Sequence, residues 1–121
     1  MEFSIGKNST LPILKMQVVN NGKTELDEFN QVIENSAIFF SMKNMKNGSY
    51  KILNSPAGFV ERTKENIDAP TEYYVYYRFS SGDTRTAGLY EGEFMFRNEE
   101  GTYLLPIREK LTIKINETNV I

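Results

Sequence analysis

The amino-acid sequence predicts an all-β fold, an antiparallel β-sandwich of about seven to eight strands with at most one short helical turn. Turn-forming residues recur at short intervals, and the segments between them alternate apolar with polar residues in the period of two that strands have. No segment has helical periodicity over the length that a crossover between consecutive parallel strands requires. The chain of 121 residues, 40% hydrophobic and 25% charged, has the size and composition of one globular domain.

Seven segments between the turns are expected to form strands. In chain order they are residues 14–19, 38–43, 50–53, 59–62, 72–79, 90–97 and 110–115. The predicted single domain, residues 1–121, has a core of about 6–115, an N-terminal arm (1–8), an insertion (55–71) and a C-terminal tail (116–121). Only residues 24–35 have near-helical spacing, and that segment is too short and too rich in Asn for more than a turn or two.

Residues 72–79 form the strongest strand candidate, because six of the eight positions hold β-branched or aromatic residues. We expect a central strand whose core face carries Tyr73, Val75, Tyr77 and Phe79. Its other face carries Tyr74 and Tyr76, with Arg78 beyond them. Tyr and Arg are enriched at protein interfaces, so these three residues are a candidate interface. The alternative, equally favoured, is that the insertion 55–71 covers this face within the monomer.

The turn before residue 90 has the sequence features of a tyrosine corner. Tyr90 begins an alternating strand, two residues after Gly88 and just after a polar turn. We expect its hydroxyl group to hydrogen-bond to the backbone a few residues upstream, which favours an immunoglobulin-like β-sandwich. The alternative is that Tyr90 is one more inward-facing aromatic residue in a chain rich in Tyr.

The N-terminal arm has the pattern of a short added strand. Phe3 and Ile5 alternate with Glu2 and Ser4. Because a small sandwich leaves strand edges that can accept a strand from a partner, we expect this arm to be ordered on a neighbouring chain. Phe3 and Ile5 are therefore candidate interface residues.

The composition excludes the common catalytic designs. The chain contains no Cys, His or Trp, so it cannot form a Ser-His-Asp triad, a Cys nucleophile, a usual zinc site or an imidazole proton shuttle. Glu91 and Glu93 share a predicted strand face, as the paired carboxylates of glycoside hydrolysis would, but the nearby Arg97 favours an exposed charged face. We expect no enzyme activity, no cofactor and no metal site.

The charge of the chain indicates which classes of partner to expect. The net charge is −2, the sequence pI is about 5.2, and the 14 basic residues are dispersed along the chain. We therefore expect neither a nucleic-acid partner nor a membrane partner. The sequence has no apolar run of roughly 18 residues, and its first residues lack the pattern of a signal peptide. We therefore expect the product to stay where it is translated.

A series of short motifs follows the strands along the chain. In order they are Leu11-Pro12-Ile13-Leu14-Lys15, Asn21-Gly22-Lys23, residues 37–43, residues 73–78, residues 88–94, Leu105-Pro106 and residues 111–115. Together they resemble the N-terminal immunoglobulin-like domain of phage baseplate upper proteins and related phage virion modules, from about Gly6 to Ile115. The insertion 55–71 before the tyrosine-rich segment departs from that pattern.

The resemblance implies a structural module of a phage virion without chemistry of its own. Such a module would dock onto other virion proteins as a baseplate, tail or head adaptor or as a capsid decoration, in a homo-oligomer or another symmetric assembly. It would be assembled in the host cytoplasm. The residues themselves leave a second hypothesis open, a carbohydrate-binding or receptor-binding β-sandwich module that uses the exposed tyrosines.

Overall fold

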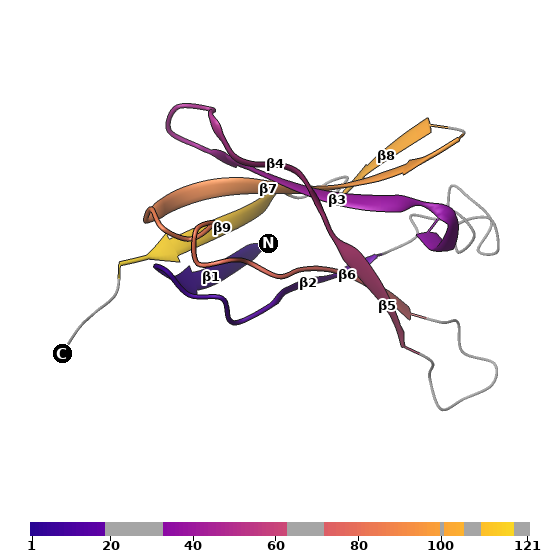
Figure 1. Ribbon diagram of the computed structural model, residues 1–121, viewed down its shortest axis with the longest axis horizontal. Coiled ribbons are helices and arrows are strands. Elements are labelled where there is room, and N and C mark those ends of the chain that lie inside the picture. Colours follow the sequence, from indigo (N-terminus) through magenta and orange to yellow (C-terminus); the bar gives the residue numbers. More distant parts are fainter. Residues whose placement is uncertain (19–32, 63–71, 100, 106–109, 118–121) are drawn as a thin grey trace.

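The computed structural model describes residues 1–18, 33–62, 72–99, 101–105 and 110–117 (Figure 1). Within these residues the chain forms nine strands and a short helical turn at residues 33–35. The strands are β1 (Glu2–Gly6), β2 (Leu14–Val18), β3 (Ala37–Asn44), β4 (Tyr50–Pro56), β5 (Gly58–Arg62), β6 (Glu72–Tyr77), β7 (Gly88–Asn98), β8 (Gly101–Leu105) and β9 (Leu111–Asn116).

The strands are arranged in two open sheets, consistent with a sandwich-like arrangement. Sheet A has the order β1-β9-β7-β3-β4, with β8 paired to β7, and sheet B has the order β2-β6-β5. The chain passes from sheet A to sheet B where β4 runs on into β5, which Figure 1 shows as one long diagonal segment. The all-β fold predicted from the alternating pattern is confirmed as two sheets of six and three strands.

The core lies between the two sheets and is built from alternate residues of their strands. In β2 the residues are buried and exposed in turn, and β9 has the same alternation with half-exposed positions. Phe40 of β3 contacts rings from both layers, because its ring centroid lies 4.6 Å from that of Tyr77 in sheet B and 5.0 Å from that of Phe94 in sheet A. Since Cys is absent, aromatic and aliphatic burial hold the layers together without a disulfide.

All seven predicted segments form strands with slightly different ends, and the predicted central strand is central. β6 lies between β2 and β5, with Tyr73, Val75 and Tyr77 buried as expected. The strand ends at Tyr77, two residues before the predicted end, although Phe79 is still buried. Of the segment 24–35, the structure describes only residues 33–35, which are helical.

β1 and β8 bring the number of strands in the described residues to nine, above the seven to eight expected. The arm that forms β1 was expected to be a short strand on a neighbouring chain, whereas β8 was not predicted. β8 contains Tyr103, Leu104 and Leu105 in succession and therefore lacks the alternation by which the other strands were predicted. It forms because β7 continues to Asn98 and returns through a tight turn, with Asn98 opposite Gly101. Hairpin pairing rather than side-chain pattern determines this strand.

The expectation of a purely antiparallel fold is corrected by β1, which pairs with β9 in parallel, from Glu2 opposite Thr112 to Gly6 opposite Asn116. Sheet A is therefore a mixed sheet. A sequence without a helical pattern long enough for a crossover argues against parallel pairing only between strands that are consecutive along the chain. The first and last strands are separated by the whole domain, so no short connection restricts their relative direction.

The expectation that the N-terminal arm lies on a neighbouring chain is corrected by the same pairing. Ile5 is only 2% exposed and belongs to the core of its own chain, and the Phe3 ring stacks on that of Phe79 at 6.0 Å. After β1, the Asn8 amide donates to the Thr84 carbonyl at 2.9 Å. Residues 1–8 thus belong to the sandwich, because the edge of β9 within the same chain accepts the strand.

Candidate functional site

The candidate interface predicted on the tyrosine-rich strand lies on the outer face of sheet B. Tyr74 and Tyr76 are half-buried and Arg78 is exposed, while the alternate residues of β6 point into the core. On the neighbouring β2, the exposed Gln17 and Lys15 lie opposite Tyr74 and Tyr76. The structure therefore brings the three predicted residues together on one accessible face.

The ring of Tyr76 lies across the backbone of the adjacent strand. Gly58 of β5 is its register partner, and a Cβ atom added at Gly58 would come within 2.7 Å of the Tyr76 Cζ atom and hydroxyl oxygen. A side chain at position 58 would thus displace the ring. The guanidinium carbon of Arg78 lies 5.8 Å from the centroid of the same ring, within the range of a cation–π interaction. Gly58 thus leaves room for the Tyr76 ring, and Arg78 lies beside it.

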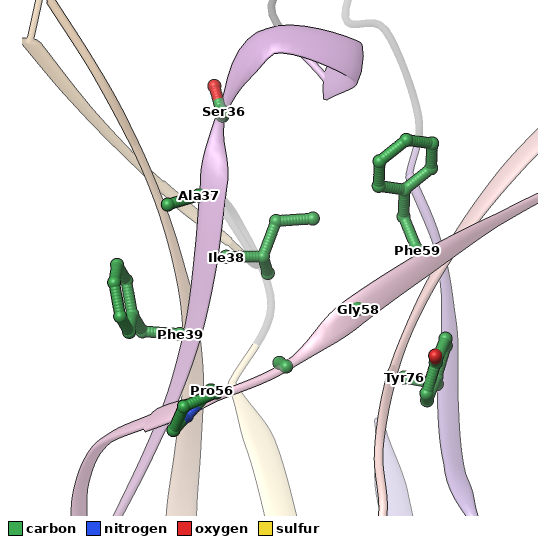
Figure 2. A pocket seen from close by; sticks show the side chains of 9 residues that line it. Ser36, Ala37, Ile38, Phe39, Pro56, Gly58, Phe59 and Tyr76 are labelled. Carbon is green, nitrogen blue, oxygen red and sulfur yellow. The ribbon is translucent and has the colours of Figure 1, made fainter.

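An open groove of about 410 Å³ adjoins this face where β4 passes into β5. Its lining is mainly apolar and includes Ile38, Phe39, Pro56, Phe59 and Tyr76. Figure 2 shows Phe39 and Ile38 pointing to opposite sides of β3, with Phe59 and Tyr76 across the groove from them. Tyr76 therefore belongs both to the outer face of sheet B and to the groove.

The insertion 55–71 was the alternative cover for this face. Its described part, residues 55–62, ends β4 and forms β5, which pairs edge to edge with β6 instead of lying over Tyr74 and Tyr76. Within the described residues, this segment approaches the face at Gly58, beneath the Tyr76 ring, and at Val60, which lies opposite Tyr74. Residues 63–71 lie outside the described residues, so the alternative is not decided for them.

The hydrogen bond predicted for the tyrosine corner is present. The Tyr90 hydroxyl group donates to the Thr86 carbonyl oxygen at 2.8 Å, and Tyr90 is 2% exposed. Gly88, which begins β7, has a φ of 152°, a value that glycine accepts more readily than other residues. This hydrogen bond stabilises the connection from β6 in sheet B to β7 in sheet A at the end where it enters β7.

A second polar junction fixes the other end of the same connection, and the sequence pattern did not indicate it. The hydroxyl group of Tyr77 donates to the Asp83 carboxylate at 3.1 Å and lies 3.1 Å from the Ser55 hydroxyl oxygen. The Ser80 amide also donates to Asp83, at 2.9 Å. Burial raises the pKa of Tyr77, and the Asp83 charge adds to that rise, while the contact with Ser55 offsets part of it.

The paired carboxylates Glu91 and Glu93 lie on the outer face of sheet A. Glu91 is opposite Lys43 of β3, with the Lys43 Nζ atom 4.0 Å from a Glu91 carboxylate oxygen, and Glu93 is exposed. This is the geometry of a solvated charged face. In the part of the chain that the structure describes, no group of three or more acidic side chains is placed to hold a metal ion.

Comparison with family models, with curated proteins and with solved structures found no match for this chain. Among the described residues, no helix has the length and apolar character needed to cross a membrane.

Proposed function

We propose that this chain is a non-enzymatic structural protein of a phage virion, an immunoglobulin-like module that works through protein–protein contacts. The virion setting rests on the order of sequence motifs, and the mode of action rests on the surface around Tyr76. Other virion proteins are its proposed partners, at a position in the baseplate, in the tail or on the head. Assembly would take place in the host cytoplasm.

The strand order supports the immunoglobulin-like part of the proposal. In that fold one sheet holds the second, fifth and fourth strands of the constant-type set, and the other holds the third, sixth and seventh. Counting β2 as the second strand, sheet B contains β2, β6 and β5, while β3, β7 and β9 are neighbours in sheet A. β4 beside β3 corresponds to the extra strand of variable-type domains. The Tyr90 hydrogen bond falls at the connection where the fold has its tyrosine corner.

The single observation that carries the proposed mode of action is the packing of the Tyr76 ring. The ring lies over Gly58 and beside Arg78, and it is half-buried in the chain by itself. Side chains that are already ordered lose little conformational entropy on association, and Tyr and Arg are the residues in which binding energy concentrates. The half-buried ring and the exposed guanidinium group therefore suit a protein-binding surface.

Incorporation into purified particles tests this proposal. Tagged chains are supplied during infection by the phage that carries the gene, and their copy number per particle is measured by quantitative mass spectrometry. We expect wild-type chain at a fixed copy number and a loss of about tenfold for Tyr76→Ala and Arg78→Ala. Lys51→Ala, on the exposed part of β4, is the matched control and should be incorporated normally.

Two measurements make the outcome decisive. Thermal unfolding of each variant shows whether its sandwich is intact, so that loss of folding is not mistaken for loss of contact. Wild-type chain absent from purified particles would contradict the virion role. If a glycan array shows binding by the isolated chain that Tyr76→Ala abolishes, the same surface serves the alternative, carbohydrate-binding function.

A further inference from the structure

A row of apolar side chains crosses the outer face of sheet A. Pro56 of β4 lies opposite Phe39 of β3, Phe39 opposite Met95 of β7, and Met95 opposite Leu104 of β8. Directly opposed residues point to the same face of a sheet. Pro56 and Leu104 are exposed, and Phe39 and Met95 are half-exposed. Contiguous apolar patches on a protein surface mark interaction sites when they are large, and these four side chains form one continuous row.

Two opposite charges stand on either side of this apolar row. Glu93 precedes Met95 by two residues on β7, and Arg97 follows it by two, so each charged residue lies roughly 6.5 Å along the strand from Met95. Both are exposed, and within the described residues neither makes an ion pair. The nearby Glu91 is already paired with Lys43. An apolar centre with charges at its margin is the layout of a protein interface.

We propose that a second copy of this chain packs face to face on this surface, with the two-fold axis running along the apolar row. That rotation lays one row on the other and reverses the direction of β7 in the second copy. Glu93 then faces Arg97 of the partner subunit, and Arg97 faces Glu93 of the partner subunit. Charges placed symmetrically about the row are thus complementary to themselves, as an isologous contact requires.

The packing uses a geometry that sheets commonly adopt. Two sheets stacked face to face lie about 10 Å apart with their strands aligned to within about 30°. The rotation brings the strands of the two copies close to antiparallel, within that range. The outer face of sheet B, with Tyr74 and Arg78, stays outside this contact, which meets the groove beside Tyr76 only at Phe39 and Pro56. The inference is argued from sheet A and does not depend on the proposed virion role.

Charge reversal tests the contact through sedimentation velocity over a range of protein concentrations. We expect the wild type to dimerise, and Arg97→Glu or Glu93→Arg alone to weaken dimerisation by about tenfold or more, because each places like charges opposite one another twice. The double variant Glu93→Arg, Arg97→Glu restores the pairing and should dimerise as the wild type does. Lys15→Glu changes charge on the far sheet and serves as the control.

Two outcomes of this experiment overturn the proposed dimer, and one supports it. A wild-type chain that stays monomeric at about 100 µM, a concentration at which even weak specific contacts associate, overturns the proposal. A dimer that both single reversals leave intact also overturns it, because its contact lies elsewhere. Restoration by the double variant supports the two-fold pairing, since loss of folding in a single variant would not be repaired by a second charge change.

Discussion

Tyr90 stabilises the connection between the two sheets through one partly buried hydrogen bond, from its hydroxyl group to the Thr86 carbonyl oxygen. Tyr90→Phe removes that bond and keeps the ring in the core, so we expect the free energy of unfolding to fall by about 1 kcal/mol. Urea unfolding measures the change. Tyr50→Phe is the control, because Tyr50 is 55% exposed and its substitution should cost much less. Equal losses for the two variants would contradict a special role for the corner.

The two buried hydroxyl groups also predict a dependence of stability on alkaline pH. Burial raises the pKa of both Tyr77 and Tyr90 above the ordinary value of 10.0. Because the folded state holds these protons more tightly than the unfolded state, their contribution is present below about pH 10 and is lost as the pH rises through the folded pKa.

Unfolding by urea at a series of pH values from 8 upwards measures this effect. We expect the free energy of unfolding to decline above about pH 10, and to decline less in Tyr77→Phe, which has no hydroxyl group to ionise at the junction with Asp83. A decline of the same steepness in wild type and variant would show that other groups cause it.

At the scale of the strands, β1 contributes a core residue and does not act as a free arm. Ile5 is 2% exposed, whereas its neighbour Ser4 is exposed and lies on the other face of the strand. We expect Ile5→Ala to lower the free energy of unfolding by about 2 to 5 kcal/mol, and Ser4→Ala to have little effect. Urea unfolding of dilute, monomeric protein makes the comparison. An equally small effect for both variants would contradict the parallel pairing of β1 with β9.

The strands differ in how far the sequence predicts them. β6 and β2 carry their burial pattern in the alternation of residues, because each lies in a sheet with one face in the core. β1 is different, since its pairing with β9 joins the two ends of the domain and leaves no local signal of direction. β8 depends on a hairpin to β7 and has no alternation of its own.

At the scale of the whole molecule, the sequence predicts the parts of a site that lie on one strand. It does not predict the contacts that join distant segments. Tyr76 and Arg78 fall on one exposed face because they share the period of one strand. The tie between Tyr77 and Ser55 joins sheet B to sheet A, and the apolar row through Phe39 joins strands whose register is set by the fold. Contacts between distant segments follow from register and topology, which the alternation of one segment does not determine.

The chain contains no Cys, His or Trp, so other side chains tie its two sheets together. The molecule consists of two sheets tied by aromatic packing and by hydrogen bonds at one connection, and both sheets carry side chains suited to contacts on their outer faces. In our proposals, sheet A contacts a second copy, and Tyr76 and Arg78 of sheet B contact a virion partner.

The central claim, that the surface around Tyr76 is covered by a partner in the virion, is tested most directly by hydroxyl-radical footprinting of purified particles. The oxidation rate of Tyr76 is compared between particles and the isolated chain, with Tyr50, which is 55% exposed on β4, as the reference. We expect oxidation of Tyr76 to slow several-fold in particles relative to Tyr50. Equal relative rates in the two preparations would contradict the claim.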